Sequence, residues 1–230
     1  MSQLVLLRHG ESHWNRTHRL TGWTDVDLTQ HGESEAREAG RVLRSSGYDF
    51  DQVFTSFLRR SIKTAFLALE EMERLWLPVT RAWQLNERHY GSLTGSDSRE
   101  FALRQRLLIE KGEPDEFIES PPTMPPGDPG DPANDDRYRD LDVSERPRAE
   151  SLGHVLDRVS AYWTLHILPE LRAGKRVLIV GHGSSLGLLV KFLGESNEEL
   201  ASIGFFPTGT PLSLELKSDL TLARRVWLRS

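Results

Sequence analysis

The stretch LVLLRHGES at residues 4–12 decides the fold, because a short apolar strand runs directly into an arginine, a histidine and a glycine. RVLIVGHGSS at residues 176–185 repeats part of this pattern, with a second apolar run before histidine, glycine and serine. If the two strands lie side by side and parallel, His9 and His182 emerge together at the carboxyl edge of the sheet, where open α/β folds place their ligands. The arginine beside the first histidine then predicts a phosphate-binding site at this edge.

Length and composition indicate a globular protein with one domain. At 230 residues the chain reaches the upper end of the usual domain size, and we predict a single domain over residues 1–230. It has no cysteine, which excludes disulfides, thiolate catalysis and cysteine-based metal sites. The apolar run at residues 4–7 is too short for a signal peptide or a membrane span, so we expect a cytoplasmic protein. The net charge is -5 with interleaved signs, which argues against nucleic acid or an anionic membrane as partner.

Strand-like and helix-like patterns alternate along the chain. This alternation predicts an α/β fold, a three-layer sandwich in which a mostly parallel sheet carries helices on both faces. The expected strands span residues 4–7, 52–55, 79–82, 176–180, 212–216 and 223–228. The expected helices lie between Thr29 and Gly47, between Ser56 and Pro78, at residues 151–168 and at residues 184–193. Ser56 is expected to cap its helix, and the apolar stripe of that helix is expected to extend to Trp76.

Residues 112–147 interrupt this alternation. They hold eight of the twelve prolines and three glycines, so they cannot form a long regular element. Long segments without regular structure inside a domain are usually either disordered excursions or lids over a site. Both alternatives stay open at this point, and we call the segment the lid-like insertion.

Five sequence blocks in a fixed order identify a family. They are RHGESHWN at residues 8–15, TGWTDVDLT at 21–29, TSFLRRSIKT at 55–64, LNERHYGSLTG at 85–95 and GHGSSL at 181–186. Together these blocks resemble the cofactor-dependent phosphoglycerate mutases of the histidine phosphatase superfamily, over nearly the whole chain. The resemblance implies the three-layer fold of the phosphoglycerate mutases.

The resemblance also implies roles for individual residues. His9 is the residue that becomes phosphorylated, Glu87 is the proton donor, and the transferring phosphoryl group is surrounded by Arg8, Arg60 and His182. Substrate contacts are implied at Asn15, Thr21, Gly22, Arg88, Tyr90, Gly183 and Ser184.

The chemistry of these residue types agrees with such roles. Phosphoryl transfer spreads negative charge over the equatorial oxygens, so two arginines and a second histidine would form a stabilising cationic cage. A neutral imidazole is a competent nucleophile near pH 7. Glu87 can protonate the leaving alkoxide if burial keeps its carboxyl group protonated. Gly10 and Gly183 are expected to let backbone N–H groups approach phosphate oxygens, and no metal is expected.

Two of these assignments have a structural alternative. Arg59 and Arg60 are adjacent, and one of them is expected to be only a solvated surface charge. Glu87 and Arg88 could form an exposed ion pair, which would contribute little to stability. The family blocks favour Arg60 as the phosphate ligand and Glu87 as the acid.

The chain departs from the mutases where they bind the distal part of the substrate. Ser98 stands at the position of their substrate-binding lysine, with Arg99 beside it. Pro114 and Asp115 replace their adjacent arginines, and Ser184 replaces their asparagine after the second histidine. Losing these cations removes charge-assisted hydrogen bonds worth roughly 1.5–3 kcal/mol each, so bisphosphate affinity should fall by several orders of magnitude.

These departures favour a phosphatase that hydrolyses a small phosphate monoester through a phosphohistidine intermediate. The first alternative is a 2,3-bisphosphoglycerate-dependent phosphoglycerate mutase, and the second is a catalytically silent phospholigand-binding protein. No cofactor is expected for the phosphatase, whereas the mutase would need 2,3-bisphosphoglycerate. The expected partner is a small phosphorylated metabolite, and a homodimer is an open alternative because the family is often dimeric.

Overall fold

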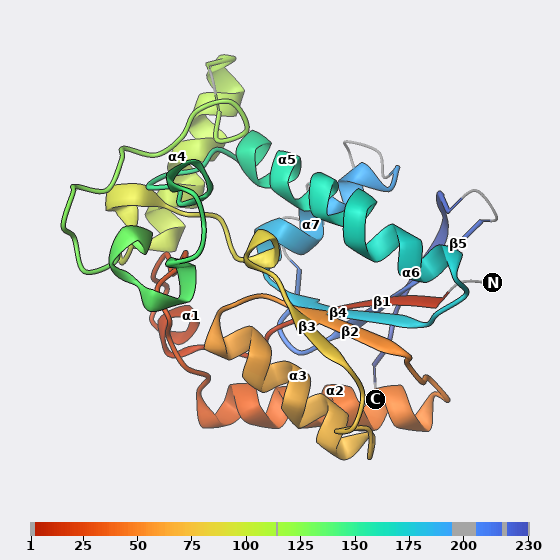
Figure 1. Cartoon of the computed structure of the whole chain (residues 1–230). Helices are drawn as coiled ribbons and strands as arrows, with labels where there is room; N and C mark the ends of the chain where they lie inside the picture. The colour runs from red at the N-terminus through yellow and green to blue at the C-terminus, as the bar shows by residue number, and fades with distance from the viewer. Residues whose placement is uncertain (1–2, 114, 195–205, 218–219, 230) are drawn as a thin grey trace.

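Six strands in the described part of the chain form one sheet at the centre of the structure (Figure 1). The computed structural model describes residues 3–113, 115–194, 206–217 and 220–229. The strand order across the sheet is β3-β2-β4-β1-β5-β6. The strands span Gln3–Arg8 (β1), Gln52–Thr55 (β2), Val79–Arg81 (β3), Val177–Gly181 (β4), Pro211–Leu216 (β5) and Leu222–Trp227 (β6).

The two strands that precede histidines are neighbours in the sheet. β1 and β4 pair in parallel, with Arg8 opposite Gly181. His9 and His182, the next residues, therefore both lie at the carboxyl edge of the sheet. β2 and β3 continue the parallel part, whereas β5 runs antiparallel to both β1 and β6. The prediction of a mostly parallel sheet is therefore confirmed, and the strand register brings the two histidines together.

Helices cover both faces of the sheet, as the alternating pattern predicts. In Figure 1, α2 and α3 lie on one face, and α5, α6 and α7 lie on the other. The helices span His13–Arg16 (α1), Gln30–Ser45 (α2), Arg59–Glu71 (α3), Ser98–Lys111 (α4), Leu152–Tyr162 (α5), Leu168–Arg172 (α6) and Gly183–Phe192 (α7). A π-helical turn, Trp163–Ile167, joins α5 to α6.

Alternation along β1 divides the core between the two faces. Leu4 and Leu6 pack with residues of α5 and α7, whereas Val5 and Leu7 pack with residues of α2 and α3. β4 is buried at every position, because both of its faces are covered. This burial fixes the ends of the two central strands, and hence the residues that follow them.

The second predicted helix is shorter than its pattern indicates. α3 begins at Arg59, so the prediction that Ser56 caps it is wrong. Trp76 lies beyond the end of the helix and is 75% exposed, so it does not continue the apolar stripe. The helix ends early because Glu73 takes a left-handed conformation, with φ at 57°.

The sequence pattern does not predict α4. None of its residues is buried, so it lacks the apolar stripe by which a helix is recognised from sequence. Its first turn is capped by the Asp97 carboxylate, which accepts from the backbone N–H groups of Arg99 and Glu100. Gly112 ends the helix in the left-handed conformation, with φ at 68°.

The lid-like insertion packs at the end of the sheet that carries the histidines. Figure 1 shows it, in green, at the same end of the sheet as α1. It contains short 3-10 turns at Pro132–Asn134, Asp136–Tyr138 and Val143–Glu145. Tyr138 is buried, with its ring 4.8 Å from that of Trp23 and 5.9 Å from that of Phe57. Its hydroxyl oxygen accepts from Nδ2 of Asn86, so this part of the insertion is anchored in the core.

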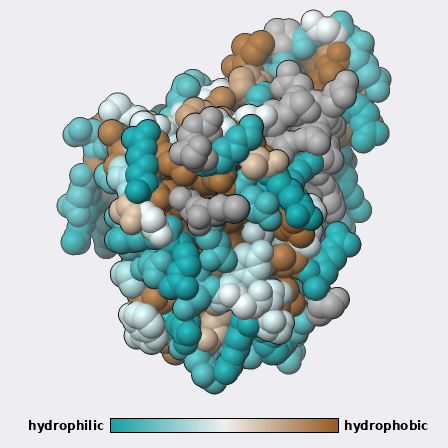
Figure 2. All heavy atoms as spheres, turned by 90° about the vertical axis from the view of Figure 1, so that its right-hand side faces the viewer, coloured by the Kyte–Doolittle hydropathy of each residue, from teal (hydrophilic) through white to brown (hydrophobic). Residues whose placement is uncertain are grey.

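The opposite end of the sheet has an ordinary solvated surface. Figure 2 views this end and shows mostly hydrophilic residues over its lower half, with apolar residues in separate small groups. In the described ranges, no helix has both the length and the apolar composition needed to cross a bilayer.

Candidate active site

The ends of β1 and β4 bring two imidazoles together. The backbone N–H of His9 donates to the carbonyl oxygen of Gly181 over 3.0 Å, which ties the two strand ends to each other. The rings of His9 and His182 lie with their centroids 5.0 Å apart and their planes at 59°. Both side chains are buried. The two rings are therefore within reach of one small ligand.

His9 has a fixed ring orientation and an unprotonated Nε2. Its Nδ1 lies 2.7 Å from the carbonyl oxygen of Gly10, which can only accept, so Nδ1 carries the hydrogen. Burial lowers the pKa of His9 well below its usual range, and the Arg60 and Arg8 cations lower it further. His9 is therefore neutral at pH 7, which is the state that a nitrogen nucleophile requires.

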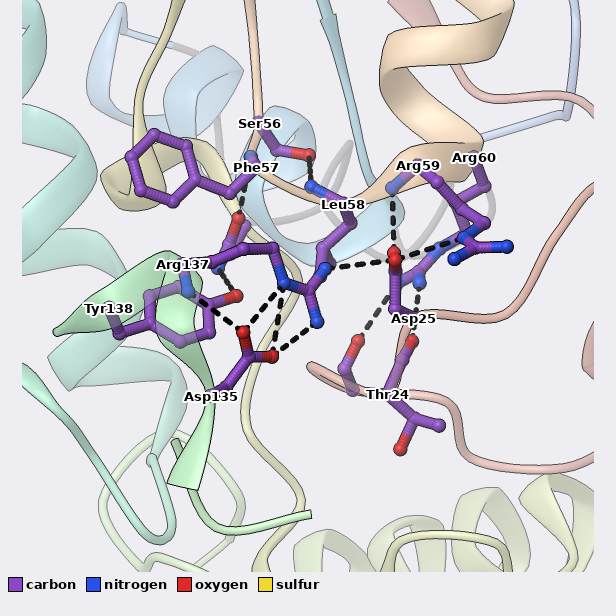
Figure 3. Close-up of polar contacts among 12 residues, drawn as sticks. Thr24, Asp25, Ser56, Phe57, Leu58, Arg59, Arg60, Asp135, Arg137 and Tyr138 are labelled. Atoms are coloured by element: carbon purple, nitrogen blue, oxygen red, sulfur yellow. Dashed lines mark hydrogen bonds and ion pairs between the residues drawn. The ribbon is translucent and has the colours of Figure 1, made fainter. Parts of the chain in front are cut away.

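Arg60 lies beside that unprotonated nitrogen. It belongs to the first turn of α3, is buried, and places its Nε 3.3 Å from Nε2 of His9. Nη1 and Nη2 donate to the carbonyl oxygens of Thr24 and Gly22 at 2.9 and 2.8 Å, which holds the guanidinium group in place (Figure 3). Burial lowers the pKa of Arg60 to about 10, although the Glu87 carboxylate opposes this change, so Arg60 is charged at pH 7.

The adjacent Arg59 turns toward the surface. Its side chain is 58% exposed and pairs with Asp25 at 2.9 Å. Asp25 also pairs with Arg137 of the lid-like insertion, at 3.0 Å (Figure 3). The structure thus brings Arg60, and not Arg59, to the histidines, while Arg59 helps to hold the insertion.

Two buried nitrogen atoms at the site have no partner among the described residues, namely Nε of Arg8 and Nδ1 of His182. One other nitrogen of each side chain holds it in place. Nη1 of Arg8 donates to the carbonyl oxygen of Phe206 at 2.5 Å, and Nε2 of His182 lies 2.8 Å from Oγ of Ser56. Buried polar atoms in proteins are nearly always hydrogen-bonded. These two atoms therefore indicate the place of a polar ligand.

Glu87 joins the site through the turn that follows His182. Its side-chain Oε1 accepts from the backbone N–H groups of Arg88 at 2.8 Å and Ser184 at 3.3 Å. Its backbone carbonyl oxygen accepts from Nη2 of Arg158 at 3.0 Å. Glu87 is buried, so the expected alternative of an exposed ion pair does not describe it. The carboxyl group is thereby held at the start of α7, next to the second histidine.

Four of the predicted substrate contacts surround the histidines and Glu87. Gly22 presents a carbonyl oxygen to the guanidinium group described above. Gly183 lies next to Arg8, and a β-carbon at residue 183 would make ordinary contact with its guanidinium carbon, at 3.6 Å. Ser184 donates its backbone N–H to the Glu87 carboxylate, and its side chain is hydrogen-bonded to Tyr90. Burial raises the pKa of Tyr90, so its hydroxyl group is protonated at pH 7.

The other three predicted contacts use their side chains within the protein. Asn15 accepts from the backbone N–H of Ser12 at 3.1 Å, as part of the cap of α1. Thr21 is buried and its hydroxyl donates to a nearby backbone carbonyl at 3.4 Å. Arg88 is 1% exposed and pairs with Glu116 of the lid-like insertion at 2.5 Å. The structure thus places Arg88 as an anchor of the insertion.

Gly10 serves close packing, and its own backbone N–H group is not available to a phosphate oxygen. That N–H group already donates to Oγ1 of Thr64 at 3.1 Å. A β-carbon on Gly10 would lie 2.1 Å from the carbonyl oxygen of Gly32 in α2. The glycine is needed because the loop after β1 touches the backbone of α2.

The positions that differ from the mutases supply no free cation in the part of the chain that the structure describes. Ser98 begins α4. Arg99 is 68% exposed, and its guanidinium group binds the Asp97 carboxylate at 2.6 Å. Asp115 uses its carboxylate to accept a local backbone N–H at 3.0 Å, and Pro114 lies outside the described residues. The Arg99 guanidinium group is thus occupied by Asp97 in this structure.

A cavity of about 560 Å³ lies beside the loop that anchors Arg60. Thr24, whose carbonyl oxygen holds that guanidinium group, lines the cavity, together with two tryptophans, Tyr138 and four aspartates. Arg137 is the one cation in its described lining, and it is paired with Asp25 and with Asp135. The cavity wall is thus aromatic and acidic, and three of its four aspartates, Asp25, Asp131 and Asp135, are paired with arginines.

Sequence reasoning missed three residues that organise the site. Ser56 contacts the second histidine, and its position directly after β2, at the same sheet edge, was the available signal. Arg158 and Glu150 form a buried pair, with Nε and Oε1 2.6 Å apart, that holds the backbone of Glu87. No local sequence pattern indicates the Arg158–Glu150 pair, because the Glu87 backbone that it holds is far away in the sequence.

Comparison with known proteins agrees with this geometry. The profile of the histidine phosphatase superfamily (branch 1) matches residues 4–219. An alpha-ribazole phosphatase from Shigella flexneri is 24% identical, with a TM-score of 0.67 over 99% of this chain and 96% of that chain. Rv3214 from Mycobacterium tuberculosis is 25% identical, with a TM-score of 0.65 over 97% and 96% of the two chains. YhfR from Bacillus stearothermophilus is 22% identical, with a TM-score of 0.67 over 97% and 95%.

These likenesses confirm the predicted fold and the predicted family resemblance. The structural neighbours share the six-stranded α/β arrangement across nearly the full length of both chains. The family profile covers almost the whole sequence, including both histidine-bearing strand ends. The chain therefore belongs to the histidine phosphatase superfamily, branch 1.

Proposed function

We propose that this protein is a phosphatase that hydrolyses a small phosphate monoester through a phosphohistidine at His9. The observation that carries the proposal is the pair of unpartnered buried nitrogens, Nε of Arg8 and Nδ1 of His182, beside the unprotonated Nε2 of His9. A transferring phosphoryl group has three equatorial oxygens that gain charge. Arg8, Arg60 and His182 are the donors that hold these oxygens.

In the first half of the reaction, Nε2 of His9 attacks phosphorus and the bond from phosphorus to the ester oxygen breaks. Nε of Arg60, which lies 3.3 Å from the attacking nitrogen, is close enough to bind an oxygen of the phosphoryl group. Glu87 acts as the general acid, so its carboxyl group must take up a proton before this step, and it gives that proton to the leaving alkoxide. The products of this half are a free alcohol, phosphohistidine and the Glu87 carboxylate.

In the second half, a water molecule attacks the phosphohistidine. The Glu87 carboxylate takes a proton from this water, the bond between nitrogen and phosphorus breaks, and inorganic phosphate leaves. His9 returns to its neutral form with the hydrogen on Nδ1, and Glu87 returns to its acid form. The side chains thus complete a cycle with no net change in their protons.

The distal part of the substrate is proposed to carry no second phosphate. A mutase must retain a doubly phosphorylated intermediate, whereas Arg99 and Arg137 are already paired with Asp97, Asp25 and Asp135. One structural neighbour is named an alpha-ribazole phosphatase, which supports hydrolysis over isomerisation.

The proposed chemistry draws its charges and its proton from side chains. Among the described residues, no group of three or more histidine, aspartate or glutamate side chains is arranged to hold a metal ion. Because the proposed reaction takes its positive charge from the arginines and its proton from Glu87, phosphate release should persist in a chelator. Activity that is lost on chelation and restored by a divalent ion would overturn this part of the proposal. A small phosphorylated metabolite as partner, a cytoplasmic location and a homodimer stay predictions.

A screen of phosphorylated metabolites and p-nitrophenyl phosphate for phosphate release tests the proposed function. It should be run beside an assay of 3- to 2-phosphoglycerate conversion, with and without 2,3-bisphosphoglycerate. We expect at least one monoester to be hydrolysed faster than phosphoglycerate is isomerised. Isomerisation that exceeds the hydrolysis of every ester would indicate the mutase, and binding with neither activity would indicate a silent phospholigand-binding protein.

A further inference from the structure

Ser56 and His182 form a fully buried hydrogen bond at the edge of the phosphate site. Ser56 directly follows β2, and His182 directly follows β4, the neighbouring strand. The serine Oγ lies 2.8 Å from Nε2 of the imidazole, and both side chains are 0% exposed. In a buried pair of this kind, the direction of the hydrogen bond decides which nitrogen of the imidazole carries the hydrogen.

The partners of the hydroxyl group determine that direction. The backbone N–H of Leu58 donates to Oγ of Ser56 at 3.1 Å and can only donate. Among the described residues, the hydrogen of the serine hydroxyl then has one acceptor within reach, Nε2 of His182. If Nε2 carried a hydrogen instead, the buried hydroxyl hydrogen would have no acceptor. The contacts therefore favour the neutral ring with its hydrogen on Nδ1.

That Nδ1 atom forms no hydrogen bond of ordinary geometry within the described residues, although the imidazole caps the start of α7 loosely over the backbone N–H of Ser185. We propose that Ser56 is a positioning residue that holds His182 as the Nδ1–H tautomer, so that the ring donates to an oxygen of the transferring phosphoryl group. This inference rests on the proposed phosphatase function. In the opposite tautomer, Nδ1 would turn a lone pair toward the anionic phosphoryl group and repel it.

The surroundings of His182 keep its ring uncharged, so its tautomer decides whether Nδ1 can donate a hydrogen bond. Burial lowers the pKa of His182 well below its usual range, and the facing Arg60, His9, Arg8 and Arg158 act in the same direction. The free protein therefore holds a neutral ring at pH 7, with one hydrogen to place.

Ser61 offers a matched control for Ser56. It is likewise 0% exposed, and it lies five residues further along, in the first turn of α3. Its hydroxyl group donates to the carbonyl oxygen of Val180 at 2.7 Å and contacts Oγ1 of Thr55 at 2.7 Å. It touches neither histidine in the described contacts. Ser61→Ala thus removes a buried hydroxyl group of the same kind without changing the partner of His182.

The test is ¹⁵N NMR of the histidine rings in the substrate-free protein, with His182 assigned by His182→Gln. We expect the wild type and Ser61→Ala to show His182 with a protonated Nδ1 and an unprotonated Nε2. Ser56→Ala should lose this single tautomer and slow phosphoenzyme formation at least about tenfold relative to Ser61→Ala. Ser56→Thr, which keeps the hydroxyl group, should restore the tautomer.

A wild-type spectrum with the hydrogen on Nε2 of His182 would overturn the proposal, whether or not Ser56→Ala folds. Equal tautomers and equal phosphorylation rates in Ser56→Ala and Ser61→Ala would overturn it as well. The tautomer is recorded without substrate. A failure of the proposed role of Ser56 can therefore be told apart from a failure of the proposed phosphatase activity. The latter would appear as a missing phosphoenzyme in the wild type.

Discussion

Nε of Arg60 lies 3.3 Å from Nε2 of His9, the atom at which the proposed phosphoryl transfer occurs. Two backbone carbonyl oxygens, from Gly22 and Thr24, hold the other guanidinium nitrogens. The cation is thus in place before a substrate arrives, and little reorganisation is needed when charge develops on the phosphoryl oxygens.

Arg60→Lys should therefore lower the turnover of any monoester substrate by about 10²-fold or more, because an ammonium group cannot keep both carbonyl anchors and face His9. Arg59→Lys is the matched control. Arg59 is 58% exposed and pairs with Asp25, so its variant should keep turnover within about twofold. Steady-state phosphate release measures both, and equal losses in the two variants would remove Arg60 from the site.

Glu87 should matter in proportion to how poor the leaving group is. An alkoxide needs a proton when it leaves, whereas nitrophenolate hardly does. Glu87→Gln should thus reduce the turnover of an alkyl phosphate by about 10²-fold or more and that of p-nitrophenyl phosphate by less than about tenfold. The aryl ester serves as the control for the alkyl ester within the same variant, because the two substrates share one site. Similar losses on both esters would show that Glu87 positions the substrate or supports the fold.

The free energy of unfolding should fall as the pH is lowered from 6.5 to 4, because His89 is buried and uncharged in the folded protein. Burial, chiefly, lowers its pKa from 6.5 to about 4, and its Nδ1 accepts from the backbone N–H of Gly91. The unfolded chain therefore binds a proton in this window that the folded protein does not. The contribution is complete above pH 6.5 and is lost as the pH falls toward 4, by about 3 kcal/mol in total.

Denaturant unfolding at pH 7 and pH 4.5 measures this effect. His9 and His182 act in the same direction, since their pKa values are also lowered. His89→Gln should reduce the difference between the two pH values, while a variant of the exposed His31 should keep it. The carboxylate of Asp51, with a pKa lowered to about 2, contributes only at lower pH. If the difference in unfolding free energy between pH 7 and pH 4.5 were unchanged in His89→Gln, His89 would not be the group responsible.

Arg99 should contribute little to turnover, and added 2,3-bisphosphoglycerate should not stimulate the protein. The Arg99 guanidinium group is exposed and bound to Asp97, so Arg99→Ala should change phosphate release by less than about twofold. The same variant should leave the weak binding of bisphosphoglycerate unchanged in calorimetry. A large loss of binding or of bisphosphoglycerate-dependent isomerisation in Arg99→Ala would mean that Arg99 does replace the missing lysine.

The central part of the fold could be predicted from local patterns. The strand at residues 52–55 has the predicted bounds, and both histidine-bearing strands are neighbours as the parallel interpretation requires. Buried parallel strands give continuous apolar runs, and glycines in the left-handed conformation, such as Gly47, end helices at recognisable places. Motif order then indicated the family.

The lid-like insertion and the support of the site could not be predicted in this way. Tyr138 is placed by Asn86, and Arg88 is placed by Glu116, so the insertion depends on side-chain pairs between distant segments. Ser56 fits the pattern of a helix cap, yet its hydroxyl group finds a tertiary partner in His182. Such contacts depend on the assembled sheet and leave no periodic signal in the sequence.

The most direct test of the account is to quench the protein during turnover and to map covalent phosphate by mass spectrometry. We expect a base-stable, acid-labile phosphoryl group on His9 in the wild type and none in His9→Ala. His13→Ala, at an exposed histidine nearby in the sequence, should be labelled like the wild type. Equal labelling of His9→Ala, or turnover of a monoester by His9→Ala at the wild-type rate, would contradict the central claim.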